Sequence, residues 1–138
     1  MAVSPEDFLT LGRSVEGRAD CSEIELRSAY RCAYYAVHHA AKQALPRLGL
    51  VLVKARHGGA HADVEVSLIN AGTHEAKELV AQMKRLKRFR VDCDYYLEKT
   101  IDRGLLSARL ADAADTFASL MRLGILAGET FPSKEQAE

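Results

Sequence analysis

The fold of the chain depends first on residues 22–45, SEIELRSAYRCAYYAVHHAAKQAL. This stretch contains no glycine or proline, and alanine, the strongest helix former, recurs through it. Ser22 followed three residues later by Glu25 forms a capping box, which marks the beginning of a helix. Pro46 follows directly and disfavours helical backbone at Leu45. We therefore expect one long helix over residues 22–45.

This helix has two unlike sides when its residues are placed about 100° apart. One side is small and apolar, so that a neighbouring helix can approach closely: Leu26, Ala29, Ala33, Ala36, Ala40 and Ala44. The opposite side is cationic and edged with tyrosines: Arg27, Arg31, His38 and Lys42, flanked by Tyr34 and Tyr35. Such a side is usually a solvated face. It can also form a groove for a phosphate backbone or a nucleobase, and the sequence leaves both interpretations open.

The remaining elements are also predicted to be helices. A first helix over residues 5–16 has Ser4 as its N-cap and Pro5 at its first position. Others are expected over residues 62–70, 73–97 and 105–123, with an irregular segment at 46–60 and a frayed tail from about residue 127. Apolar residues recur in steps of four and three along the last helix, at Leu106, Leu110, Ala113, Phe117 and Leu120. We expect one all-α domain over residues 1–138, an antiparallel bundle of about five helices.

Composition limits the classes of function. Lys plus Arg and Asp plus Glu are 19 each, so any surface that attracts nucleic acid must be a local patch. The cysteines, Cys21, Cys32 and Cys93, are odd in number and lack CxxC spacing, which predicts free thiols in a reducing compartment. The sequence shows no secretory signal at residue 1 onward and no apolar run of about 20 residues. We expect a cytoplasmic protein without a membrane span.

The helix over 73–97 carries an arginine where its apolar side should continue. That side consists of Ala76, Leu79, Met83, Leu86, Cys93 and Leu97, and Arg90 occupies the position between Leu86 and Cys93. A guanidinium keeps its charge and needs a partner there, which Asp94 can supply one turn later. Arg90 and Asp94 therefore form either a structural ion pair or part of a polar cleft between helices.

A metal site is not expected. His57 and His61 in HGGAH are four residues apart, but two glycines between them indicate a loop, and no cysteine or HExxH ligand pattern lies nearby. We accordingly expect neither a bound metal nor a cofactor.

Three motifs in order resemble the HEPN domain family, in particular its small stand-alone branch. The first is R-YYA-hA, the second H-x-x-V, and the third R-x-x-x-DY. They fall on Arg31, Tyr34, Tyr35, Ala36, His39 and Ala40, then on His61 and Val64, then on Arg90, Asp94 and Tyr95. The resemblance extends over about residues 5–123.

The resemblance implies a helical bundle that forms a homodimer. We also expect a homodimer because the alanine-rich and tyrosine-bearing faces exceed what one small bundle needs to bury. Many HEPN proteins are metal-independent ribonucleases of toxin–antitoxin, CRISPR and abortive-infection systems. Others are nucleotide-binding or accessory partners of nucleotidyltransferases. The nucleases carry R-x(4–6)-H, and no histidine follows Arg90 at that spacing, so the sequence leaves open whether this chain is an enzyme.

The resemblance and the chemistry of RNA cleavage select the candidate residues. Metal-free cleavage needs a cation for the developing phosphorane charge and a base for the 2′-hydroxyl. Arg90 is the candidate cation, with Asp94, His61 or His38 as candidate base, although a carboxylate beside an arginine is a poor base. The candidate residues for binding RNA or a nucleotide are Arg31, Tyr34, Tyr35, His38, His39 and Tyr95.

The function expected is RNA binding or ribonuclease-like action in a defence or toxin–antitoxin system. The alternative is a non-catalytic nucleotide-binding or partner module that acts with a nucleotidyltransferase.

Overall fold

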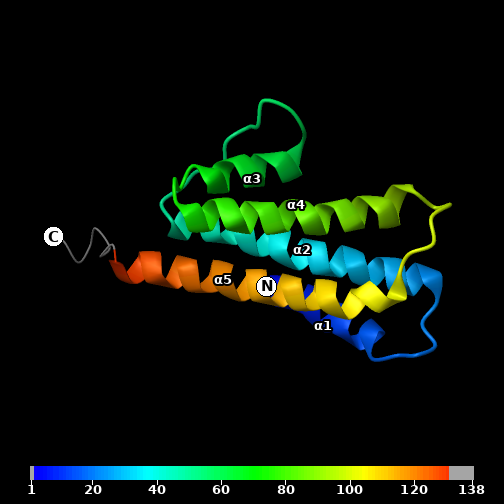
Figure 1. Ribbon diagram of the computed structural model, residues 1–138. Helices are drawn as coiled ribbons and strands as arrows, with labels where there is room; N and C mark the ends of the chain where they lie inside the picture. The colour runs from blue at the N-terminus through cyan, green and yellow to red at the C-terminus, as the bar shows by residue number, and fades with distance from the viewer. Residues whose placement is uncertain (1, 131–138) are drawn as a thin grey trace.

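The computed structural model describes the backbone of residues 2–130 and the side chains of residues 2–123. Within that range the chain is all-helical, without strands, as the sequence predicts. The elements are α1 (Pro5–Glu16), α2 (Glu23–Arg47), α3 (Ala60–Ile69), α4 (His74–Tyr95), the 3-10 turn η1 (Arg103–Leu105) and α5 (Leu106–Thr130). In Figure 1, α2 lies between its neighbours, α4 runs antiparallel to both α2 and α5, and the short α3 lies on the outer side of the bundle.

Helix α2 is the centre of the bundle because it packs against α1, α4 and α5 and also touches α3. Its alanine-rich side is buried as predicted. The interpretation of the opposite side as a solvated face holds at Arg31 and Lys42 and is wrong at Arg27, Tyr34 and His38, which are buried. Arg27 is 4 % exposed, Tyr34 0 % and His38 7 %, whereas Arg31 and Lys42 remain exposed.

Arg27 is buried because it closes the C-terminal end of α4. Its guanidinium donates hydrogen bonds to the backbone carbonyl oxygens of Cys93 at 2.9 Å and Tyr96 at 3.3 Å, and also to that of Lys99. The last carbonyls of a helix have no partner within the helix, and a cation there is favoured by the helix dipole. A buried arginine on α2 thus fixes where α4 ends.

The end of α2 differs from the prediction. The helix continues through Pro46 to Arg47, because a proline in the last turn removes only one hydrogen bond. Gly49, with φ +72°, ends it instead. The Leu50 amide donates to the Leu45 carbonyl at 2.9 Å and the Gly49 amide to the Pro46 carbonyl at 3.1 Å, which is the Schellman pattern.

Two further helix ends differ. Helix α4 stops at Tyr95, so Leu97 lies beyond it and is 74 % exposed instead of joining the apolar side. Helix α5 continues past Gly124 to Thr130, because one glycine costs a helix only about 1 kcal/mol and does not oblige it to end. The expected frayed tail from residue 127 is therefore helical up to residue 130, and its remainder lies outside the described residues.

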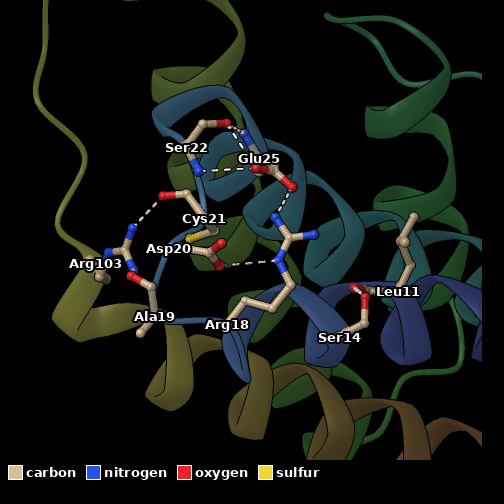
Figure 2. Close-up of polar contacts among 9 residues, drawn as sticks. All are labelled: Leu11, Ser14, Arg18, Ala19, Asp20, Cys21, Ser22, Glu25 and Arg103. Atoms are coloured by element: carbon tan, nitrogen blue, oxygen red, sulfur yellow. Dashed lines mark hydrogen bonds and ion pairs between the residues drawn. The ribbon is translucent and has the colours of Figure 1, made fainter.

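The connection between α1 and α2 is held by polar contacts from both sides (Figure 2). Arg18 pairs with Glu25, whose carboxylate also accepts from the Ser22 amide at 3.0 Å in the predicted capping box. From the other side, Arg103 donates to the carbonyl oxygen of Ala19 at 2.8 Å and to that of Cys21. These contacts fix α1 against α2.

No helix within the described residues is long and apolar enough to cross a membrane. The cysteines are free thiols, as predicted, and all three are buried.

Candidate functional site

Arg90 lies at the centre of a cluster of aromatic rings. Its side chain comes from α4 and is buried at 8 % exposure, on the apolar side where the sequence places it. The Cζ atom lies 5.3 Å from the ring centroid of Tyr34, 5.8 Å from that of Tyr35 and 6.0 Å from that of Tyr95. A guanidinium at such distances is attracted by the electron-rich ring faces. The two tyrosines of α2 and the arginine of α4 therefore form one site.

Asp94 joins two arginines from different helices. Its Oδ2 accepts from Arg90 Nη1 at 3.0 Å, and its Oδ1 lies 2.8 Å from Arg31 Nε on α2. The Asp94 side chain is 16 % exposed, whereas that of Arg31 is 49 % exposed. The expected Arg90–Asp94 pair is present, but it is part of a larger array of two cations and one carboxylate that extends to the surface.

The second side of the site is supplied by α3. Gly58, with φ +99°, and Gly59 precede the helix, and His61 in its first turn reaches back to α2. Tyr34 Oη and His61 Nδ1 are 2.6 Å apart, and the ring of His61 lies 4.6 Å from that of His38. The histidine that sequence analysis placed in a loop is thus anchored on the tyrosine of the first motif.

A third group of rings extends the cluster toward α1. His39 stacks with Tyr35 at 5.9 Å and with Phe8 at 5.4 Å between ring centroids. The interplanar angles are 26° and 24°. All three rings are partly exposed. They border an open groove between α1 and α2 that also contains Arg31.

The histidines of this site are held in their neutral forms at pH 7. Burial, with the charges of neighbouring histidines and of Lys42 and Lys87, lowers the pKa of His38 to about 4. Burial and then the charge of Arg90 lower the pKa of His61, and burial and Lys42 lower that of His39. A neutral imidazole is the form that can accept a proton.

Two buried nitrogens of the site have no hydrogen-bond partner. Among the described residues, His38 Nδ1, Arg90 Nε and Arg109 Nε are buried without one. Buried polar groups are normally paired by hydrogen bonds, and the exceptions are often found at functional sites. Two of these three nitrogens belong to the side chains around Tyr34.

All nine candidate residues fall within this connected set of contacts. Tyr95 is at its edge, 69 % exposed, and reaches it only through Arg90. Sequence analysis did not find Phe8, nor the Glu65–Lys87 ion pair of 2.7 Å that joins α3 to α4 beside the histidines. Phe8 lies beside Leu9 on a short helix and carries no motif of its own, and the packing of α1 on α2 brings it to His39. A buried glutamate on the short α3 likewise gives no signal in one sequence.

No group of three or more His, Cys, Asp or Glu side chains in the described part of the chain is arranged to hold a metal ion. His57 is exposed in the loop before α3 and does not join His61 on one helix face.

The fold and the site together define a small helical bundle with an arginine under tyrosine rings, anchored by a carboxylate. Comparison with protein-family models, curated proteins and solved structures finds no match for this chain. The function is therefore argued from the site.

Proposed function

We propose that the chain is a HEPN-type protein that binds RNA through the cluster around Arg90. The observation that carries the proposal is the array of Arg90, Asp94 and Arg31. It places two guanidinium groups beside one carboxylate, one buried and one half-exposed. The array has a net positive charge and opens to solvent at Arg31. Guanidinium groups suit phosphate oxygens, and aromatic rings suit the bases of an unpaired strand.

The site also contains part of the chemistry for cleavage. The neutral His61 can take the proton of a 2′-hydroxyl as that oxygen attacks the adjacent phosphorus, while Arg90 stabilises the charge on the phosphorane. Asp94 is a poor base because two arginines stabilise its ionised form. We therefore assign the base to His61 in a ribonuclease-like reaction, with defence or toxin–antitoxin action as the setting implied by the motifs.

One observation favours the second candidate, a non-catalytic nucleotide-binding or partner module of a nucleotidyltransferase. The leaving 5′-oxygen needs an acid, and the neighbouring histidine, His38, is buried and resists protonation. Binding without cleavage is the expected result if no other group supplies that proton.

The test is RNA binding by fluorescence anisotropy at two salt concentrations. We expect Arg90→Ala to weaken binding of a labelled single-stranded RNA at least tenfold and to lower the salt dependence by about one phosphate contact. Arg85→Ala is the matched control, because Arg85 is an exposed arginine on the same helix and its hydrogen bond is to Gln82. If both variants bind RNA with the affinity of the wild type, Arg90 does not take part in binding.

Induced expression in cells separates the two candidates. Cleavage is supported if the wild type arrests growth and fragments RNA, and if neither effect occurs with Arg90→Ala or with His61→Gln. Intact RNA together with RNA binding in vitro supports the binding module.

A further inference from the structure

The groove between α1 and α2 has the chemistry of a site for a flat ring. It is lined by Phe8 and Leu11 from α1 and by Ser28, Arg31, Cys32, Tyr35 and His39 from α2. Three of these side chains are aromatic: His39 stacks on Phe8 at 24° and on Tyr35 at 26°, whereas Phe8 and Tyr35 are tilted by 35° to each other. One further member, Arg31, carries a charge. A ring-lined groove with a single cation at its edge suits a ligand that joins a flat heterocycle to an anion.

An ion pair beyond the end of α1 connects the two helices that form the groove. Arg18, just after the end of α1, pairs with Glu25 in the first turn of α2 (Figure 2). Glu25 is in turn bonded to Ser22. A wall that is already held in place loses less conformational entropy when it binds a ligand.

Arg31 connects the groove to the Arg90 cluster. Its Nε faces Asp94 at 2.8 Å, and its Cζ lies 5.9 Å from the Tyr35 ring. Within the described residues, its two terminal nitrogens have no hydrogen-bond partner. Arg31 is therefore a side chain that lines the groove and also pairs with the carboxylate of the Arg90 cluster, so an anion bonded to it would lie close to both.

We propose that this groove stacks one unpaired nucleobase against Phe8, Tyr35 and His39, so that the ligand of the Arg90 cluster is single-stranded. The inference rests on the proposed function and specifies its substrate class. Bases in a duplex are stacked on each other and cannot enter the groove. The neutral state of His39 at pH 7 suits stacking on an uncharged ring face.

The test compares two labelled oligomers of equal charge, a hexa-adenylate RNA and an abasic hexamer with the same sugar–phosphate backbone. Phe8→Leu keeps an apolar side chain and removes the ring. We expect this variant to bind hexa-adenylate about five- to one-hundred-fold more weakly, which is the usual effect of removing one stacking ring, and to bind the abasic hexamer unchanged. The matched control is Phe89→Leu, since Phe89 is also half-buried but stacks on Tyr30 at 5.8 Å, away from the groove.

Stacking itself is read from 2-aminopurine placed in the hexamer, whose fluorescence is quenched by a neighbouring ring. Quenching by the wild type and by Phe89→Leu, lost in Phe8→Leu, supports the inference. Adenosine monophosphate as competitor distinguishes the source of the base. Competition that depends on Phe8 means that a free nucleotide suffices, and no competition means that a strand is needed.

Two results would overturn the inference. Equal affinity of the wild type for the abasic and adenylate hexamers would leave the RNA site intact but show that no base is bound. Absence of binding to either hexamer would reject the proposed function and the groove together. Circular dichroism melting of Phe8→Leu verifies that the variant tested is folded.

Discussion

Asp94 forms ion pairs with two arginines, and this determines what the loss of either one does to stability. A buried carboxylate left without a partner typically costs about 3–5 kcal/mol. In this protein Asp94 still has Arg31 as a partner when Arg90 is removed. Arg31 is half-exposed, so water reaches that ion pair. Asp94 therefore belongs both to a structural ion pair with Arg90 and to a pair with Arg31 that solvent reaches. The sequence presented these as alternatives, a structural pair or a polar cleft.

We expect Arg90→Ala to lower the free energy of unfolding by only about 1–2 kcal/mol, mostly through lost contact with the tyrosine rings. Arg31→Ala combined with Arg90→Ala should cost clearly more than the sum of the single changes, because Asp94 then has no cation. Urea unfolding of the two single variants and the double variant measures both quantities. A loss above about 3 kcal/mol for Arg90→Ala alone, without a change in RNA binding, would make Arg90 a purely structural residue.

The burial of His38 makes the stability of the protein depend on pH. Its pKa falls from 6.5 to about 4 on folding, so the unfolded chain binds more protons between these values. Stability is therefore full above about pH 6.5 and decreases as the pH falls toward 4, by on the order of 2–3 kcal/mol from this group. His38→Gln should flatten the curve of unfolding free energy against pH in that window. His57→Gln, in the exposed loop, is the control, and an unchanged slope in His38→Gln would contradict the prediction.

At the scale of helices, Arg27 connects two elements that are far apart in sequence. Arg27→Met keeps an apolar stem but removes the donors to the last carbonyls of α4. We expect a loss of about 3 kcal/mol in unfolding free energy, since hydrogen bonds from charged donors contribute about 1.5–3 kcal/mol. Amide hydrogen exchange over residues 92–99 should rise selectively. Arg88→Met, on the exposed side of α4, should change neither the unfolding free energy nor the exchange rates.

The sequence predicts the beginnings of helices better than their ends. Helices begin after Ser4, Ser22 and Thr73, close to where the sequence predicts, because capping contacts join groups that are neighbours in sequence. Ends depend more on what surrounds the chain. Pro46 was tolerated in a last turn, and α4 ends where a distant arginine bonds its carbonyls.

At the scale of the whole molecule, the sequence predicts residues that the structure brings together around Arg90, but not the residues of α1 and α3 that pack beside them. The two motifs on α2 and α4 place Tyr34, Tyr35 and Arg90 on faces that meet in any bundle where these helices pack. The position of α3 over His38 and that of α1 beside His39 depend on tertiary packing alone. Phe8 and the burial of His38 were for that reason not predicted.

Packing also changes the argument for a dimer. The alanine-rich and tyrosine-bearing sides of α2 are buried within one chain, so the expectation that they provide spare surface is wrong. Apolar side chains remain exposed elsewhere. Ile24 and Leu97, 69 % and 74 % exposed, border one open groove at the end of the bundle. Large apolar groups that lie together on a surface favour association.

A homodimer, which the motifs imply, is therefore expected to form through the Ile24 and Leu97 end of the bundle. Light scattering should give twice the 15.2 kDa mass of the chain at micromolar concentration. Ile24→Lys and Leu97→Lys should each return the mass of one chain, because a lysine ammonium in an apolar interface is desolvated without a partner. Val51→Lys, at a position 74 % exposed in the loop before α3, should leave the dimer intact. A wild type that scatters as one chain over this range would reject the dimer, and a dimer insensitive to both lysines would place its interface elsewhere.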